Sequence, residues 1–443
     1  MPETQNGEIA ERVEIGDVGD GGDGVGELAD GRVVFVPRTL PGEVVDVRIV
    51  EERENWVRGE VEQFHEQSDE RIESDCPYYA ECGGCQFWHV PYERETQLKF
   101  DATIDRIERV GGIELPEEER VEAPEDRRYR TRVRFHRRRV AEEGEASDWR
   151  VGFFGRGSHD LVGIDDCLVA AEAVNRARRE VEPGVVDVGN AELRVETADA
   201  DSAVVSITPG EEAPEEPPQS LLEFADGLDE IDAIRGVRFL GEHKEWVGGD
   251  GSVDGSEVLA DSPIETIRLP AGLFRQANPQ INRRLVAAVR EAVVEAGAAR
   301  VLECFSGVGN LTFAIADEVE AVLAVEVDEV AVEMGATMAQ FAGYEDVAFL
   351  EADLGRGLSG VRAIAAFDYE TVVLDPPRGG AAAVCEALVD SAADTIVYVS
   401  CDPAALGRDL ATLAEGGWRP TEVTLFDMFP RTAHAEVLTV LSR

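Results

Sequence analysis

A cysteine placed directly after a buried strand is the residue of this chain best suited to nucleophilic chemistry. Cys401 follows the apolar run 395–399 and precedes Asp402 and Pro403, so its thiol is expected at the end of a strand. A thiolate attacks electrophilic carbon, and one such carbon is C6 of a pyrimidine ring. Glu436, just before the last apolar run, offers a carboxylate base. The alternative is an inert cysteine buried at a strand end.

Two other strand ends carry residues typical of ligand binding. The Ser-Gly-Val-Gly turn at 306–309 follows an apolar run, and Glu326 at the end of the next run suits the diol of a ribose. This turn fits S-adenosylmethionine (SAM) better than a dinucleotide, because no pyrophosphate has to be cradled. A third run ends in Asp-Pro-Pro-Arg at 375–378, where Arg378 is expected to favour a nearby thiolate. An ordinary tight turn and a loop-capping Asp375 are the alternatives.

Four further cysteines have the spacing of a metal site. Cys76, Cys82 and Cys85 form a Cys-x5-Cys-x2-Cys pattern, and Cys167 lies far downstream. Two glycines stand between the second and third of them, which is unusual for cysteines of a core. Four thiolates suit zinc or an iron–sulfur cluster, and the spacing does not separate the two.

The segment 127–139 is the one strongly basic stretch of the chain. If it forms a strand, Arg128, Arg130, Arg132 and Arg134 share one face, because side chains alternate along a strand. In a chain with so much acid, we interpret this face as binding the phosphates of a nucleic acid. An exposed strand that balances the surrounding acidic residues is the alternative.

Apolar patterns predict the elements that position these residues. From 8 to 65, short β-rich runs alternate with glycine turns, which predicts a small barrel of the OB type. The spacing of apolar residues predicts a helix over 93–110, and the chain from 121 to 262 reads mostly as strands. From about 281 onward, helices alternate with apolar strands, which predicts a mostly parallel sheet with helices on both faces. The predicted fold class is therefore α/β, with β-rich parts before it.

Acidic residues dominate the composition. The 443 residues include 91 Asp and Glu against 42 Lys and Arg, a formal net charge of −49, and Lys99 and Lys244 are the only lysines. Acid spread over every segment is typical of a halophilic protein, because self-repulsion of this size requires strong screening by salt. No apolar stretch approaches a membrane span, the polar N-terminus is no secretory signal, and seven cysteines do not indicate a disulfide scaffold. We therefore expect a cytoplasmic protein.

Together these motifs resemble those of the RNA uracil-5-methyltransferases, in particular the 23S rRNA branch that carries an N-terminal TRAM domain and a [4Fe-4S] cluster. The resemblance covers essentially the whole chain. Its most specific parts are the cysteine pattern that begins at Cys76, Phe-Arg-Gln-Ala-Asn at 274–278, Asp-Pro-Pro-Arg at 375–378, Ser-Cys-Asp-Pro at 400–403 and the segment 428–436.

The resemblance implies a three-part architecture. A Rossmann-like SAM-dependent methyltransferase domain is expected, with an N-terminal OB-like TRAM barrel and a central β-rich iron–sulfur domain. The barrel would occupy residues 1–68. The central RNA-binding domain would take 69–92 and 113–265, and the methyltransferase domain 93–112 and 266–443.

The resemblance also implies roles for individual residues. Cys401 would add to C6 of a flipped-out uridine, and Glu436 would remove the C5 proton. The expected activity is SAM-dependent methylation of C5 of a uridine in RNA by a monomeric protein, with 23S rRNA favoured over tRNA. The residues implied for SAM binding are Gln276, Phe305, Asn310, Glu326, Asp353 and Asp375, and those implied for the cluster are Cys76, Cys82, Cys85 and Cys167.

Three other functions share part of this pattern. A tRNA T-loop uracil-5-methyltransferase would use the same residues on another RNA. An RNA cytosine-5-methyltransferase shares the thiolate chemistry, although enzymes of that kind place their cysteine in different strand-end motifs. A non-catalytic RNA-binding or redox-sensing iron–sulfur protein would explain the cysteines but not the SAM motifs, and absence of SAM binding in calorimetry would favour it.

Overall fold

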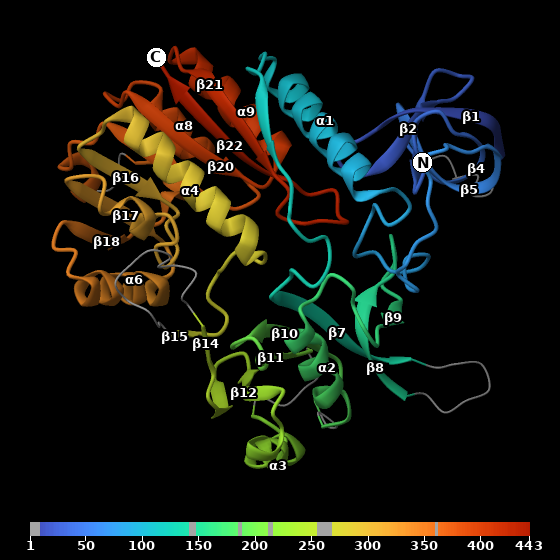
Figure 1. Cartoon of the computed structure of the whole chain (residues 1–443), viewed down its shortest axis with the longest axis horizontal. Helices are drawn as coiled ribbons and strands as arrows, with labels where there is room; N and C mark the ends of the chain where they lie inside the picture. The colour runs from blue at the N-terminus through green and yellow to red at the C-terminus, as the bar shows by residue number, and fades with distance from the viewer. Residues whose placement is uncertain (1–8, 141–147, 185–187, 211–215, 255–267, 359–361) are drawn as a thin grey trace.

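The chain folds into a barrel and two larger sheets. The structure, a computed structural model, describes residues 9–140, 148–184, 188–210, 216–254, 268–358 and 362–443. In these residues the strands form a closed barrel, a seven-stranded sheet, an eight-stranded sheet and a two-stranded ladder. Figure 1 shows the barrel in blue, the central sheet in green, and the largest sheet with its helices in yellow to red. No helix in this part of the chain is long and apolar enough to cross a membrane.

Alternating apolar side chains close the N-terminal barrel. Its strands are β1 (Ile9–Val18), β2 (Asp23–Glu27), β3 (Val33–Pro37), β4 (Val44–Glu52) and β5 (Trp56–Glu66). Val34, Val36, Val45 and Val47 fill the interior, as the period of two in a strand requires. The order is β1-β2-β3-β5-β4, with β4 paired again to β1 and β3 parallel to β5. This closure confirms the OB-type barrel predicted from the sequence.

A seven-stranded sheet in the order β13-β12-β11-β10-β7-β8-β9 forms the central part. Its elements, with the ladder that follows them, are β7 (Arg132–Val140), β8 (Asp148–Phe154), β9 (Leu161–Gly163), α2 (Glu172–Gly184), β10 (Ala191–Thr197), β11 (Ala203–Pro209), α3 (Gln219–Asp226), η1 (Leu228–Glu230), β12 (Ile234–Leu240), β13 (Glu245–Gly249), β14 (Ser252–Asp254) and β15 (Arg268–Pro270). One face, including Phe135, Leu193 and Val237, is buried with α2 and α3. The opposite face carries arginines such as Arg134 and Arg194.

An eight-stranded sheet forms the α/β part, in the order β18-β17-β16-β19-β20-β22-β21-β6. Its elements are β6 (Glu118–Val121), α4 (Pro279–Ala296), β16 (Arg300–Cys304), α5 (Thr312–Ile315), β17 (Ala321–Glu326), α6 (Glu329–Ala342), β18 (Val347–Glu351), η3 (Leu354–Arg356), α7 (Arg362–Ala365), β19 (Thr371–Leu374), α8 (Ala382–Leu388), β20 (Thr395–Ser400), α9 (Pro403–Glu415), β21 (Arg419–Phe426) and β22 (Glu436–Ser442). Strands β16 to β20 are parallel, and β22 runs antiparallel between β20 and β21. The strand order reverses between β16 and β19, which is where sheets of this kind bind ligands at their carboxyl ends.

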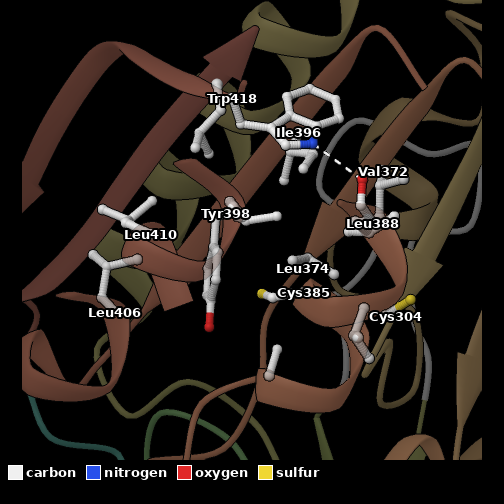
Figure 2. Close-up of a cluster of buried hydrophobic side chains, with 14 of the residues drawn as sticks. Cys304, Val372, Leu374, Cys385, Leu388, Ile396, Tyr398, Leu406, Leu410 and Trp418 are labelled. Carbon is white, nitrogen blue, oxygen red and sulfur yellow. Dashed lines mark hydrogen bonds between the residues drawn. The ribbon is translucent and has the colours of Figure 1, made fainter. Parts of the chain in front are cut away.

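Close packing on this sheet holds the strand ends in place. Figure 2 shows Leu374, Tyr398 and Trp418 in one buried cluster. The indole nitrogen of Trp418 donates to the carbonyl oxygen of Leu388 at 3.1 Å, and the hydroxyl of Tyr398 donates to the carboxylate of Asp409 at 2.6 Å. These bonds satisfy the buried polar atoms of a mostly apolar layer and fix α8 and α9 on the sheet.

Two early segments of the chain belong to this sheet. The helix α1 (Tyr92–Gly111) packs against α9, and its position confirms the helix predicted over 93–110. The strand β6 pairs in parallel with β21 at the edge. The sheet therefore includes residues that the sequence analysis placed in the central segment 113–265. The sequence did not indicate this strand, because β6 is short and acidic and carries no apolar signal. The boundary expected between residues 265 and 266 lies outside the described residues.

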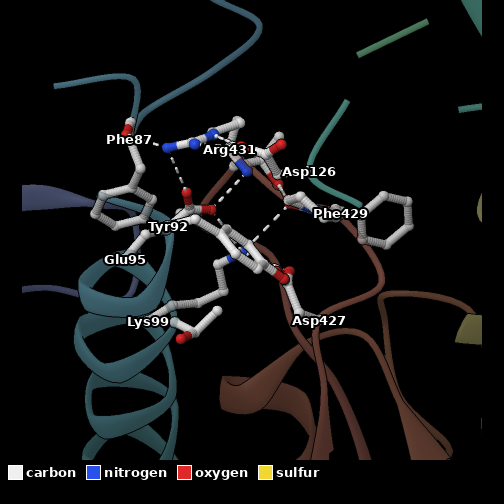
Figure 3. Close-up of polar contacts among 12 residues, drawn as sticks. Phe87, Tyr92, Glu95, Lys99, Asp126, Asp427, Phe429 and Arg431 are labelled. Carbon is white, nitrogen blue, oxygen red and sulfur yellow. Dashed lines mark hydrogen bonds and ion pairs between the residues drawn. The ribbon is translucent and has the colours of Figure 1, made fainter. Parts of the chain in front are cut away.

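A buried group of charges joins α1 to the segment before β22, as Figure 3 shows. The Nζ atom of Lys99 lies 2.6 Å from Oδ1 of Asp427 and 3.3 Å from Oε1 of Glu95. The Nη1 atom of Arg431 lies 3.2 Å from Oε2 of Glu95, and its Nε donates to Asp126 at 2.8 Å. Burial raises the pKa of Glu95 to about 7, while Lys99 opposes this shift. Removing one member would leave an uncompensated charge in the interior.

We expect Lys99→Met to lower the free energy of unfolding by about 3–5 kcal/mol, because it leaves Asp427 buried without its cation. Chemical denaturation followed by circular dichroism measures this change. Arg94→Met on the same helix is the control, since its ion pair with Glu70 is largely exposed and its loss should cost less than about 1 kcal/mol. Equal effects of the two substitutions would contradict the role of the buried charges.

Candidate active site and cysteine cavity

The two predicted catalytic residues lie side by side at the carboxyl edge of the parallel strands. Cys401 directly follows β20, and Glu436 is the first residue of β22. Ser400 is paired with Val437 in the antiparallel ladder, so the next position of the ladder brings Cys401 beside Glu436. The charge of Glu436 raises the pKa of Cys401, in agreement with this closeness. A thiol and a carboxyl group far apart in the sequence thus share one place.

Burial dominates the electrostatics of the Cys401 thiol. Burial raises its pKa to about 12, the carboxylates of Glu436 and Asp375 add to this effect, and Arg378 opposes it. Arg378 thus acts in the direction that the sequence predicts, but burial outweighs it. Formation of the thiolate therefore requires a change in the surroundings of the sulfur, such as a bound ligand brings.

Buried carboxyl groups extend from this thiol toward β16. Burial raises the pKa of Asp375 to about 7 and, together with Asp375, raises the pKa of Glu436 well above its usual range. Burial also raises the pKa of Glu303 to about 8, although the hydroxyl of Thr312 donates to it at 2.6 Å and opposes the shift. Acids crowded in a dry site favour the binding of a cation, which would relieve their desolvation and mutual repulsion.

The turn after β16 has a backbone that brings polar groups together. Gly307 and Gly309 have φ angles of 53° and 103°, and a Cβ atom at Gly309 would lie 2.5 Å from the ring of Phe313. Phe305 has a φ of 65°, a strained value for a residue with a side chain. Glu326 at the end of β17 accepts a hydrogen bond from the backbone nitrogen of Gly307 at 2.9 Å. Backbone N–H groups and a carboxylate are thus placed together, as a nucleoside site requires.

The other residues predicted to bind SAM lie on loops around this turn. Asn310 exchanges two hydrogen bonds with Asn282 of α4, at 2.9 and 3.0 Å. Asp353 follows β18, and its carboxylate accepts from the backbone nitrogen of Gly355 at 2.9 Å, which begins η3. Gln276 is buried on the loop before α4. All of these residues except Gln276 come from loops that follow parallel strands at their carboxyl ends.

Comparison with known proteins places this geometry in a family. A family profile described as tRNA (Uracil-5-)-methyltransferase matches residues 259–443, and a TRAM-domain profile matches residues 4–61. The 23S rRNA (uracil(1939)-C(5))-methyltransferase RlmD of Chromohalobacter salexigens is 35% identical over 95% of this chain and 87% of its own. This chain belongs to the RNA uracil-C5-methyltransferases. The RlmD protein of Pseudomonas putida is 31% identical over 95% of this chain and 91% of its own.

A solved structure shares the fold of this RNA uracil-C5-methyltransferase. The tRNA (uracil-54, C5)-methyltransferase of Pyrococcus abyssi, in complex with S-adenosyl-L-homocysteine, matches with a TM-score of 0.70 over 97% of this chain and 100% of that one, at 22% identity. The likeness confirms the Rossmann-like methyltransferase domain, and the TRAM match confirms the identity of the barrel.

Sequence reasoning missed some residues of this methyltransferase site. Asn282 holds Asn310 in place, and its signal was available: it stands four positions after Asn278 at the start of α4, among apolar residues of the buried face. Ser306 is 4% exposed, and its hydroxyl has no hydrogen-bond partner in the described part of the chain. A buried hydroxyl without a partner at a glycine turn marks a place for a ligand atom.

The four predicted cluster ligands line one cavity. Cys76, Cys82, Cys85 and Cys167 surround a space of about 60 Å³, together with aromatic residues and Arg130. Burial raises the pKa of Cys82 to about 11, and it raises the pKa of the other three thiols as well. Among the described residues, no group of His, Cys, Asp and Glu is arranged to hold a single metal ion. The structure thus brings the four cysteines to one place.

The arginine stretch forms the predicted strand only in part. The strand β7 begins at Arg132, and Arg128 upstream of it has a φ of 55°. The guanidinium of Arg128 donates to the carbonyl oxygen of Cys167 at 3.0 Å, and Arg130 lines the cysteine cavity. The prediction that Arg128 and Arg130 share a strand face with Arg132 and Arg134 is therefore wrong. Contacts with the cysteine loops override the alternation.

Arg132 and Arg134 do share a face of β7, but both are paired with carboxylates. The Nε atom of Arg132 lies 3.3 Å from Oε1 of Glu196, and that of Arg134 lies 3.1 Å from Oε1 of Glu192. These partners stand on β10, the neighbouring strand. The pairs reduce the positive charge that β7 alone offers to phosphate groups.

The raised pKa of Glu303 predicts a loss of stability as the pH rises. The folded protein keeps Glu303 protonated up to about pH 8, whereas the unfolded chain loses this proton near its ordinary pKa of 4.5. The contribution is complete below that value and is lost as the pH rises toward 8, because the folded state binds the extra proton. The Glu303→Gln variant should therefore gain on the parent by about 1.4 kcal/mol per pH unit in this window.

Denaturation of both proteins at a series of pH values between the two pKa values measures this gain. Glu329→Gln, at an exposed position of α6, is the control for the loss of one acidic residue. Parent and Glu303→Gln curves with the same pH dependence would show that Glu303 is not protonated by burial.

Proposed function

We propose that this RNA uracil-C5-methyltransferase transfers a methyl group from SAM to C5 of a uridine in 23S rRNA through a covalent bond between Cys401 and C6. The observation that carries the proposal is the placement of Cys401 beside Glu436 at the adjoining ends of β20 and β22, near Asp375. The relatives that match nearly the whole chain support 23S rRNA as the substrate class. The Pyrococcus enzyme acts on tRNA, but at its identity it supports the fold alone.

The proposed SAM site consists of the residues around the turn after β16. When bound, SAM supplies a methyl group on a positively charged sulfur. Glu326 suits the ribose hydroxyls. The raised pKa values of Asp375 and Glu303 fit a site that binds a positively charged ligand. The proposed SAM-binding residues are Gln276, Phe305, Asn310, Glu326, Asp353 and Asp375.

Cys401 activates the base by covalent addition. The thiol first gives its proton to solvent water. The thiolate then bonds to C6 of the flipped-out uridine, and the electrons of the C5–C6 double bond move toward the carbonyl at C4. C5 thereby becomes nucleophilic enough to form a bond to the methyl carbon, whose bond to the SAM sulfur would break with the electron pair staying on that sulfur. The Glu436 carboxylate then takes the proton from C5, the double bond forms again, and the bond between sulfur and C6 breaks with its electron pair returning to Cys401. The proton that uridine loses ends on Glu436.

The environment of the two residues suits this sequence. A carboxylate with a raised pKa is a stronger base than an ordinary one, which helps Glu436 to remove a carbon-bound proton. Arg378 favours the thiolate of Cys401, and the neutral thiol of the resting enzyme is protected from unwanted reactions. Burial raises the pKa of both Cys401 and Glu436. It therefore protects the thiol from unwanted reactions and makes the Glu436 carboxylate a stronger base.

Cys401→Ala is expected to abolish methyl transfer, and Glu436→Gln to accumulate a covalent protein–RNA adduct, because the C5 proton then stays in place and the bond to C6 cannot break. Transfer of labelled methyl groups and denaturing electrophoresis measure the two effects. Cys385→Ala, which removes a thiol from the buried core instead, should keep both properties of the parent. Methyl transfer by Cys401→Ala, or no adduct with Glu436→Gln, would refute the assignment.

The class of RNA is decided by mapping modified bases in a deletion strain. Loss of 5-methyluridine from 23S rRNA alone supports the proposal. Loss from tRNA alone would make the protein a T-loop enzyme, and loss of 5-methylcytidine would make it a cytosine-5-methyltransferase.

We further propose that the cysteine cavity holds a [4Fe-4S] cluster. Four half-buried thiols with raised pKa values need cations to become thiolates together. In a cubane cluster each thiolate binds its own iron, so the sulfurs surround a space instead of one ion. Cys76, Cys82, Cys85 and Cys167 line such a space. Methyl transfer from SAM needs no electron, so we assign the cluster a structural role between the loop of Cys76 and the central sheet.

Cys82→Ala and Cys167→Ala are expected to remove iron and acid-labile sulfide from anaerobically purified protein and to lower its melting temperature. Metal analysis and thermal unfolding measure this, with Cys304→Ala as a control outside the cavity. Reduction of the parent should leave turnover unchanged while the fold persists. Zinc in place of iron in the parent, or turnover that follows the redox state, would contradict the proposal.

The proposal also includes concentrated salt as the working medium of a monomeric, cytoplasmic enzyme. The net charge of −49 supports the high-salt medium, because salt near 1 M shortens the Debye length to about 3 Å and so screens the repulsion between acidic residues. Assays of the enzyme therefore belong in multimolar KCl.

A further inference from the structure

Arginines on the polar face of the central sheet stand in one row across the strands. Arg134 of β7 lies directly opposite Arg194 of β10. Ser206 of β11 lies between Arg194 and Arg238 of β12 in the same register. This face is opposite to α2 and α3, because Leu193 and its equivalents point toward those helices. Like charges directly opposite each other destabilise a strand pair. Glu192 and Glu245 compensate Arg134 and Arg238, but Arg194 between them has no ion pair among the described residues.

Part of this row is buried without a partner. The side chain of Arg238 is 11% exposed; its Nε pairs with Glu245 at 2.6 Å, but its Nη1 has no hydrogen-bond partner among the described residues. The hydroxyl of Ser206, a residue only 2% exposed, lacks a partner there too. Gly272 passes so close that a Cβ atom on it would lie 2.7 Å from Nη1 of Arg238. A buried donor without an acceptor is unfavourable, so an acceptor is expected at this place.

Arg238 and Gly272 border an open groove of about 830 Å³ between the central sheet, the β14–β15 ladder and the start of α6. Arg194, Arg238 and Arg268 lie on its walls, and we name it the arginine groove. Its three carboxylates are occupied: Glu245 pairs with Arg238 at 2.6 Å, Asp250 pairs with Arg268 at 3.3 Å, and Asp328 accepts the first backbone N–H groups of α6. Arg194 forms no ion pair within the described ranges, and its nearest acceptor is the carbonyl of Gly272 at 3.5 Å.

We propose that the arginine groove binds the phosphate backbone of the RNA substrate outside the nucleotide held at Cys401. Within the groove, Arg194 and Arg238 stand two strand spacings apart, about 10 Å at ~4.8 Å each. A single phosphate cannot bridge this width, whereas successive phosphates of a nucleic acid chain can. In a chain with a net charge of −49, such a concentration of guanidinium groups is an exception. The inference rests on the proposed function and names a binding site for its substrate.

The groove adjoins the active site through the backbone. Gly272 and Leu273 line it and lead into the loop that carries Gln276. Asp328 lines the opposite side, two residues after Glu326. RNA in the groove would therefore begin next to the methyl-donor site. Phosphate contacts of this kind set the register of a nucleic acid without reading its bases.

The test compares two double variants of the full-length enzyme. Arg194→Gln with Arg268→Gln removes two charges from the groove, and Arg176→Gln with Arg179→Gln removes two from α2 on the other face of the same sheet. Binding of a labelled single-stranded RNA is measured over a series of KCl concentrations. The groove variant should bind more weakly, with a salt slope shallower by about 1.4, because each lost phosphate contact removes about 0.7. The α2 variant should keep the parental slope.

Calorimetry with SAM separates the remaining outcomes. Weaker RNA binding with parental SAM affinity supports the groove as an RNA site. A parental salt slope in the groove variant would overturn the inference, and so would a loss of SAM affinity with RNA binding intact, which would assign the groove to the methyl donor. A failure of the proposed function would be seen in another measurement: the parent enzyme itself would transfer no methyl group to C5 of uridine.

Discussion

Charges buried in the segment between β21 and β22 hold the parts of this enzyme together. Glu95 of α1 accepts a hydrogen bond from the backbone nitrogen of Arg431 at 2.5 Å and pairs with its guanidinium at 3.2 Å (Figure 3). The carbonyl of Pro430 accepts from the hydroxyl of Tyr129 in the central part at 2.9 Å, and backbone N–H groups of the cysteine loop donate to the carbonyl of Arg431. The helix α1 and two separate segments of the central part thus meet on the residues just before Glu436. The position of the proposed base depends on charges that lie outside the reaction.

The parallel strands could be predicted from the sequence because they are buried on both faces and read as apolar runs. Their ends then place Glu326, Asp375 and Cys401 at one edge, which is a rule of parallel sheets and needs no coordinates. The position of Glu436 beside Cys401 could not be derived in this way. It depends on β22 entering antiparallel between β20 and β21, a choice of topology that no local pattern encodes. The edge strand β6 was not predicted for a related reason, since its four residues can be recognised as a strand only from their pairing with a partner strand.

The basic residues show why local patterns have limits. Alternation predicts a common face only while the backbone stays extended. The backbone is not extended at Arg128, upstream of the start of β7, because its φ angle is 55°. The cause is tertiary, because Arg128 holds the carbonyl of Cys167, a distant residue. Lys99 was visible as one of two lysines, and Glu95 is near in the chain, but the carboxylate closest to its Nζ, that of Asp427, lies 328 positions away. Burial of a charge can be anticipated from the sequence only when its counter-charge is near in the chain.

The methyltransferase domain is synthesised in an order that separates its early elements from the elements they pack against. The helix α1 and the strand β6 are synthesised before the central sheet, whereas β21, their neighbour in the finished fold, follows roughly 300 residues later, a delay of about 15–60 s at ~5–20 residues per second. Throughout that interval Glu95 and Lys99 have neither Asp427 nor Arg431, and the apolar side of α1 has no α9 to cover it. A nascent chain must therefore carry an unmatched amphipathic helix through most of its translation. Shielding by chaperones or by the translating machinery would matter more for this helix than for the barrel, whose strands emerge consecutively.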